Sequence, residues 1–256
     1  MVVDKKNEQQ KMLDISFEQS VLAKKERSRM NIKTIKEKSK IEVTLINSMG
    51  NDLTVANAAR VSFGKTSNMD NSDPWGPPVL LEKDAKLISY LAKHKHMSPF
   101  GHCFASFHIK APIFVARQLV KHKFLRWNEI SRRYVNDEPE FYIPEFRKAV
   151  KNKKQGSGEL LNSERLKVRF EREMVSAAHS YHYLLHQGVC PEQARMVLPQ
   201  NTMTEWYWSG SLDAFSDMCL LRCKPDTQAE TRQVADKISK EMITIFPVSW
   251  SELQDD

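Results

Sequence analysis

A dense run of cations directly after an apolar segment constrains the fold of this chain more than any other feature. The eighteen residues from Arg117 to Tyr134 hold seven cationic side chains, counting His122, and Glu129 is their only acid. The segment before them, 112–116, reads Pro-Ile-Phe-Val-Ala. Proline suits the first turn of a helix, and the bulky apolar residues require burial. The pattern therefore predicts a buried helix from which the cations extend into a loop.

The distribution of the net charge of +7 favours a small anionic ligand over a long nucleic acid. Residues 1–40 hold 11 Lys and Arg residues against 6 Asp and Glu residues, and they contain no Gly, Pro or Trp. This composition predicts a basic, flexible N-terminal extension. The remaining chain is nearly neutral but basic around 117–133, where Arg offers paired contacts to phosphate and Lys a point charge. A solvated basic face is the alternative interpretation of that local charge.

Nothing in the sequence predicts membrane insertion, secretion or metal binding. No run of about 18 apolar residues occurs, and no apolar signal segment opens the chain. The four cysteines are therefore expected to be reduced thiols in a cytoplasmic protein. The histidines at 94–102 lack Cys or carboxylate partners at a familiar ligand spacing, and those at 179–186 are expected to be solvated or at an interface. No metal site is predicted.

Apolar periodicity predicts a mixture of strands and helices from residue 41 onward. Apolar residues alternate or cluster as in strands at 41–46, 102–109, 140–144 and 202–208. They repeat at the helical period at 55–60, 82–94, from 112 onward, 163–187, 211–223 and 228–246. Asn51 or Asp52 is expected to cap the first helix, and Pro247 to end the last. Loops are expected at 64–78 and 147–158.

The basic stretch resembles the signature of flavin-dependent thymidylate synthases. That signature reads Arg-His-Arg, seven residues and then Ser, with Asn-Glu before the Ser and Arg-Tyr after it. Here Ser131 follows Lys121-His122-Lys123 after seven residues, with Asn128-Glu129 and Arg133-Tyr134 in register. Further segments resemble the family in the right order, so that the likeness spans about 41–246: 57–63, 96–102, 140–144 and 188–199.

The resemblance implies a mixed α/β fold, with an antiparallel sheet packed with long helices, in a single catalytic domain of residues 41–256. It implies the reductive methylation of dUMP to dTMP for deoxynucleotide biosynthesis, with methylenetetrahydrofolate as one-carbon donor, NADPH as reductant and FAD as cofactor. It also implies a homotetramer with shared active sites, in the cytoplasm of a bacterium or a virus-infected host cell.

The family match carries over to individual residues. Arg222 and Ser131 are the candidate catalytic residues: Arg222 would stabilise negative charge on the uracil ring, and Ser131 would contact substrate, since no base is evident beside it for a nucleophilic role. His96 would lie beside the reacting rings of flavin and folate. The residues expected at dUMP are Gln118, Lys121, Glu129, Ser131, Arg133, Arg195 and Arg222. Those expected at FAD are Ser98, Lys121, His122, Lys123, Glu129, Ser211 and Asp217.

Departures from the family pattern keep two alternatives open. Lys121 and Lys123 replace arginines, Arg126 replaces a small residue, and Asp213 stands where an Arg is often found. These changes leave room for a related flavin- and folate-dependent transfer to the pyrimidine C5, such as hydroxymethylation. The basic stretch would also suit a nucleotide- or nucleic-acid-binding protein without turnover, although no stacking-aromatic array or helix-turn-helix pattern is present. Cys190 precedes Pro191, the reverse of the Pro-Cys setting of thiol-dependent synthases.

Overall fold

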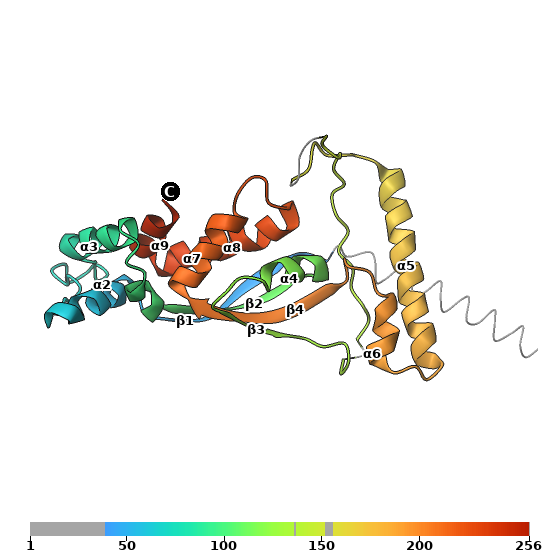
Figure 1. Ribbon diagram of the computed structural model, residues 1–256, viewed down its shortest axis with the longest axis horizontal. Helices are drawn as coiled ribbons and strands as arrows, with labels where there is room; N and C mark the ends of the chain where they lie inside the picture. The colour runs from blue at the N-terminus through green and yellow to red at the C-terminus, as the bar shows by residue number, and fades with distance from the viewer. Residues whose placement is uncertain (1–38, 136, 152–155, 256) are drawn as a thin grey trace, which may run out of the picture.

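A four-stranded antiparallel sheet lies at the centre of the computed structural model, which describes residues 39–135, 137–151 and 156–255 (Figure 1). The strands are β1 (Glu42–Met49), β2 (Phe104–Pro112), β3 (Leu125–Glu129) and β4 (Met203–Ser211), and their order in the sheet is β1-β2-β4-β3. β2 and β4 pair along their whole length, from Phe104 opposite Ser211 to Pro112 opposite Met203. The predicted extension, apart from residues 39 and 40, lies outside the described residues.

Helices α4 (Ile113–Leu119), α7 (Leu212–Arg222) and α8 (Ala229–Ile245) cover one face of this sheet (Figure 1). Alternate strand residues such as Phe107 and Trp208 are fully buried there, because side chains along a strand point to opposite faces in turn. Phe215 of α7 meets both rings edge-on, with centroids 5.3 Å from Phe107 and 5.6 Å from Trp208. These contacts pack α7 against the central strands β2 and β4.

Three further helices gather at one end of the sheet: α2 (Asp52–Arg60), α3 (Glu82–Lys93) and α9 (Pro247–Gln254) (Figure 1). Asn51 caps α2 through a reciprocal pair of hydrogen bonds with Thr54. The buried carboxylate of Asp52 accepts hydrogen bonds from the backbone N–H groups of Val248 and Ser249. Asp52 thus caps a helix that lies almost two hundred residues away in sequence.

The opposite end carries α5 (Glu164–His186), α6 (Pro191–Ala194) and a short 3-10 helix, Arg195–Val197 (Figure 1). They pack on a second, smaller core that includes Phe141, Ile143, Met174 and Ala178. Ser163 caps α5, and Gly188 follows the helix with φ of +79°, in the left-handed region that glycine adopts without strain.

Most of the predicted elements are confirmed, and three expectations are wrong. Residues 140–144 form no strand; the described chain there makes a single bridge from Phe141 to Thr202, and Pro144 has no N–H to extend the pairing. β3 lies where a loop was expected, because pairing with β4 overrides its polar sequence. The helix at 228–246 ends at Ile245, before Pro247 as expected, but it is not the last helix, because Pro247 starts α9, where its missing N–H is tolerated in a first turn. No described helix is long and apolar enough to cross a membrane.

Candidate functional site

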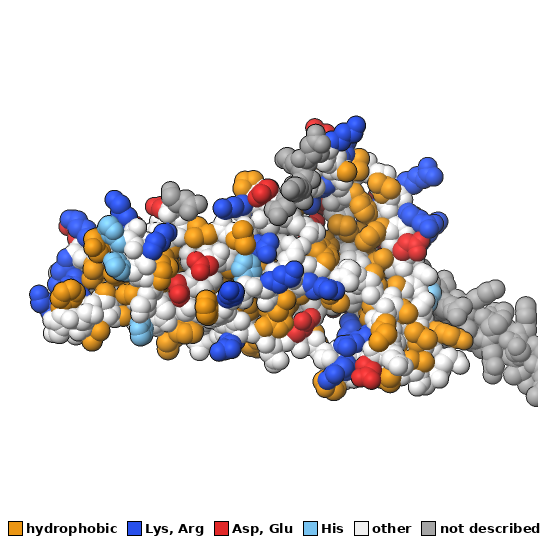
Figure 2. Space-filling model, in the orientation of Figure 1, with side chains coloured by type: hydrophobic (Ala, Val, Ile, Leu, Met, Phe, Trp, Pro, Cys, Tyr) orange, Lys and Arg blue, Asp and Glu red, His pale blue; other side chains and the backbone are white. Residues whose placement is uncertain are grey.

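The expected site residues lie in three regions of the folded structure. The largest group surrounds the turn between α4 and β3, next to the end of α7, and includes Lys121, His122, Lys123, Asp217 and Arg222. These residues line a cavity of about 400 Å³ together with Phe124, Ala214 and Leu221. On the face drawn in Figure 2, Lys and Arg side chains gather over the middle of the molecule, around α4.

Backbone contacts fix the shape of the turn that carries Lys121 to Lys123. The N–H of His122 donates to the carbonyl of Leu119 at 3.0 Å, so the turn begins directly at the end of α4. Phe124 then has φ of +64°, an uncommon conformation for a residue with a side chain. Leu125 pairs with Gly210, where an added Cβ would lie 2.4 Å from the Leu125 side chain. Glycine at 210 therefore allows the end of the turn to approach β4 closely.

Arg222, in the last turn of α7, is held by the same turn. Its Nε donates to Nε2 of His122 at 3.0 Å, and one terminal nitrogen donates to the backbone carbonyl of Gln118 at 3.4 Å. Within the described part of the chain, Arg222 forms no ion pair with a carboxylate. Its positive charge therefore remains available to an anionic ligand.

Burial and then the charge of Arg222 lower the pKa of His122 to about 4. At neutral pH the imidazole is uncharged. Because its Nε2 accepts a hydrogen bond from Arg222, the proton resides on Nδ1. The turn therefore presents one N–H donor between two lysines.

The first two turns of α7 bring two carboxylates, Asp213 and Asp217, to this region. Desolvation and next the charge of Asp213 raise the pKa of Asp217, while Lys95 lowers it. One oxygen of Asp213 is buried and has no hydrogen-bond partner among the described residues. Ser211 is the residue before α7, and its side chain makes no capping hydrogen bond. This turn suits a ligand's hydrogen-bond donor better than a phosphate, since like charges repel.

Gln118 connects the turn to a neighbouring cavity. The cavity measures about 870 Å³ and shares Leu221 and Arg222 with the first. The Gln118 side chain accepts from Thr231 at 3.1 Å and donates to Gln228 at 2.6 Å, both of which belong to the start of α8. Sequence reasoning missed these two residues, because no local pattern relates positions more than a hundred residues apart.

A second group lies at the other end of β3. Glu129 and Arg195 line a cavity of about 190 Å³. One oxygen of Glu129 accepts from Thr204 at 2.7 Å, and the other accepts from the indole N–H of Trp127 at 3.2 Å. The carboxylate is thereby fixed between β3 and β4. Thr204 was not anticipated from the sequence.

Ser131 and Arg133 follow β3 in an exposed turn. The N–H of Tyr134 donates to the Ser131 carbonyl at 2.9 Å, and the hydroxyl of Ser131 accepts from the N–H of Arg133 at 3.3 Å. The Arg133 guanidinium carbon lies 5.1 Å from the centre of the Tyr134 ring. Both candidate ligand-binding side chains are therefore available at the surface.

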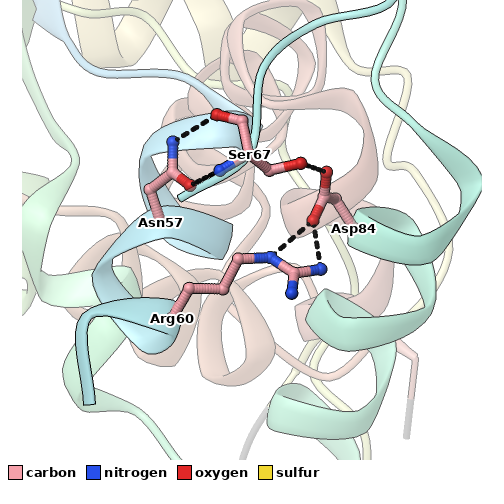
Figure 3. A network of polar contacts seen from close by, with 4 residues as sticks. All are labelled: Asn57, Arg60, Ser67 and Asp84. Atoms are coloured by element: carbon pink, nitrogen blue, oxygen red, sulfur yellow. Dashed lines mark hydrogen bonds and ion pairs between the residues drawn. The ribbon is translucent and has the colours of Figure 1, made fainter. Parts of the chain in front are cut away.

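The third group, His96 and Ser98, lies among α2 and α3. It lines a cavity of about 810 Å³ whose wall includes Arg60 and Tyr90. The rings of Tyr90 and His96 are nearly parallel, with centroids 6.1 Å apart. Figure 3 shows that Arg60 is directed at Asp84, which also accepts from Ser67, so that α2, the following loop and α3 are joined beside this cavity.

Within one chain these three groups do not share a cavity. Gln118, Lys121, His122, Lys123, Asp217 and Arg222 are brought together around the α4–β3 turn. Glu129 and Arg195 line another cavity, and His96 and Ser98 a third.

Comparisons with known proteins agree on one family. The family described as thymidylate synthase complementing protein matches residues 44–248. A flavin-dependent thymidylate synthase of Thermus thermophilus is 40% identical over 215 residues, which are 83% of this chain and 75% of that protein. One from Kosmotoga olearia is 38% identical over 213 residues, covering 81% and 87% of the two chains.

The chain is also similar, over most of its length, to solved structures of a nucleotide methylase. The crystal structure of the UMP/dUMP methylase PolB from Streptomyces cacaoi, bound with 5-Br dUMP, superposes with a TM-score of 0.73 and 29% identity. The superposition covers 84% of this chain and 95% of that one. A second structure of PolB, bound with 5-Br UMP, gives a TM-score of 0.72 and 28% identity over 86% and 96% of the two chains.

Proposed function

The chain belongs to the flavin-dependent thymidylate synthase family, and on that premise we propose that it converts dUMP to dTMP with methylenetetrahydrofolate, FAD and NADPH. The observation that carries this proposal is Arg222, a cation that uncharged acceptors hold at the rim of a cavity lined by Lys121 and Lys123. It provides the positive charge that an electron-rich pyrimidine ring requires.

The residues of the α4–β3 turn fit FAD by their chemistry. Lys121 and Lys123 offer point charges to phosphate, and Phe124 and Leu221 offer apolar contact to a flat ring. The Nδ1–H of His122 is a donor for a ring oxygen or nitrogen. FAD supplies the hydride chemistry when bound, and the protein supplies placement and charge. The unpaired oxygen of Asp213 does not fit a phosphate contact but suits a hydroxyl or amino donor.

The remaining steps belong to residues of the chain. Arg222 would lie against a carbonyl oxygen of the uracil and stabilise the negative charge that makes C5 nucleophilic. Arg195 and Arg133 would bind the phosphate of dUMP, where planar guanidinium groups give paired contacts. Ser131 would bind substrate, and Glu129, held by Thr204 and Trp127, would accept a hydrogen bond from the nucleotide.

We propose that the active site is completed between chains of a homotetramer. This is supported by the separation of Arg222 from Arg195, which line different cavities of one chain. Co-expression of an Arg222→Gln chain with an Arg195→Gln chain tests it. Either variant alone should be inactive, and mixed oligomers should regain activity, because some sites then receive both intact halves. Mixed oligomers without activity would contradict shared sites; Arg169→Gln, on the exposed surface of α5, is the control that keeps full activity.

The product identifies the reaction. The purified chain is incubated with dUMP, methylenetetrahydrofolate, FAD and NADPH, and the nucleotide is analysed by mass spectrometry, with each component omitted in turn. We expect dTMP, and no product without FAD. A hydroxymethylated product would favour the alternative transfer, for which the carboxylate of Asp213 is the motivating feature. The proposed compartment is the cytoplasm, in keeping with the bacterial relatives and with thiols that are free among the described residues.

A further inference from the structure

The orientation of Arg222 depends on the turn that follows α4. An arginine side chain has many rotamers, and fixing it in one costs conformational entropy. Nε of Arg222 is directed at His122 by the 3.0 Å hydrogen bond, and a terminal nitrogen at the Gln118 carbonyl at 3.4 Å. Only the contact to His122 is short. The imidazole is therefore the main support of the guanidinium within the described residues.

His122 is itself held in place. The backbone N–H of His122 donates to the backbone carbonyl of Leu119, a residue whose side chain is fully buried. Gln118, one turn earlier, is tied by its side chain to Thr231 and Gln228 of α8. The support for Arg222 thus extends from the core through α4 to the imidazole, so that a long flexible side chain is anchored to a rigid part of the fold.

The chemistry of the contact requires an uncharged imidazole. A protonated ring would have no lone pair for Nε of Arg222 and would place two cations 3.0 Å apart. The charged groups that line the same cavity are Lys121, Lys123, Asp217 and Arg222, three cations against one acid. Burial, and after it the charge of Arg222, lowers the pKa of His122 to about 4, so that the ring is neutral at pH 7.

From these contacts we propose that His122 is a positioning residue, whose Nε2 lone pair fixes the guanidinium of Arg222 in the orientation that meets the pyrimidine. The inference rests on the proposed function and adds to it a required tautomer, with the proton on Nδ1. The Nδ1–H remains free for the bound cofactor, so one imidazole serves both partners through different atoms.

A pair of amide substitutions separates the two nitrogens. In His122→Gln the amide oxygen reaches about as far as Nε2, whereas in His122→Asn it reaches only as far as Nδ1. We expect His122→Gln to keep kcat/KM for dUMP within about tenfold of the unaltered chain, and His122→Asn to lower it by about 10- to 100-fold, the range for a lost hydrogen bond to a charged group. Equal losses in both variants would overturn the proposal.

A double-mutant cycle assigns the effect to Arg222. In chains that already carry Arg222→Gln, the further change His122→Asn should leave affinity for dUMP unaltered, because the group that it positions is gone. FAD affinity, measured by flavin fluorescence, should fall more in His122→Gln than in His122→Asn, because only the shorter amide keeps a polar group at the position of Nδ1. A further loss of dUMP affinity in the double variant would contradict the positioning role.

NMR spectroscopy tests the contact without turnover. The imidazole nitrogens of ¹⁵N-histidine-labelled full-length chain are followed from pH 8 to about pH 4, with His122 assigned from the spectrum of His122→Gln. We expect the neutral Nδ1–H tautomer until the pH approaches the pKa of about 4, and a pKa that rises toward 6.5 in Arg222→Gln. Titration near 6.5 in the unaltered chain would overturn the proposal. If the chain makes no dTMP, the proposed function fails, while this titration still decides whether His122 holds Arg222.

Discussion

Asp84 is fully buried, and one of its oxygens accepts two hydrogen bonds from the guanidinium of Arg60 while the other accepts from the hydroxyl of Ser67 (Figure 3). Asn57 exchanges two further hydrogen bonds with the backbone of Ser67. The network joins α2, the loop after it and α3 beside the cavity that contains His96. A buried charge of this kind requires its partner, since an unpaired ion in the interior is costly.

The change Asp84→Asn should destabilise the fold by about 3 kcal/mol, because Arg60 keeps its charge and loses its counterion. Urea unfolding followed by circular dichroism measures this. Glu82→Gln is the matched control on the same helix: its partner Lys86 is exposed, so the loss should stay below about 1 kcal/mol. Equal effects of the two changes would show that burial does not strengthen the Asp84 pair.

Asp52 gives a second test of stability at the same end of the molecule. Its carboxylate accepts from the N–H groups of Val248 and Ser249 at 3.0 and 2.9 Å and caps α9. Asp52→Ala should cost about 1–2 kcal/mol, the usual range for a lost helix cap. The rate of backbone hydrogen exchange should then increase more in α9 than in α5. Asp236→Ala, an exposed acid on α8, is the control and should change stability by less than about 0.5 kcal/mol.

The cysteines should react with alkylating agents in an order set by burial. Burial is the main cause that raises the pKa of Cys103 to about 11, and it raises that of Cys219 well above its ordinary range, so both stay protonated and unreactive at pH 8. Cys190 is exposed. Mass spectrometry after iodoacetamide treatment of the native chain should find Cys190 labelled first. Rapid labelling of Cys103 would contradict the packing around it.

The stability of the chain should fall between pH 6.5 and pH 4 because of His122. Its pKa is about 4 in the folded chain against 6.5 ordinarily, so above pH 6.5 it is neutral in both states and contributes no pH dependence. Between pH 6.5 and about pH 4, His122 binds a proton in the unfolded chain but not in the folded chain, and this difference favours unfolding. The free energy of unfolding, measured with urea at pH 7.5 and at pH 5, should therefore decrease less in His122→Gln than in the unaltered chain. An equal decrease in the two chains would mean that His122 has the same pKa in the folded and the unfolded state.

Sequence patterns predicted the elements whose conformation is determined by residues close to them in sequence. α5 has a helical repeat, a cap at Ser163 and a glycine at 188, and all three act within a few residues. β3 could not be predicted this way, because its strand conformation depends on pairing with β4, about eighty residues later. The same applies to the site. The Lys121–Lys123 turn is visible as a motif, but its contact with Arg222 joins segments a hundred residues apart.

The absorption spectrum of flavin tests the central claim most directly. The purified chain is mixed with FAD under anaerobic conditions, and the visible spectrum is recorded before and after NADPH, with and without dUMP. We expect bound flavin that bleaches with NADPH, at a rate or with a spectrum that responds to dUMP, because both ligands meet the groups around Lys121 and Arg222. A chain that binds no FAD at any reasonable concentration would contradict it.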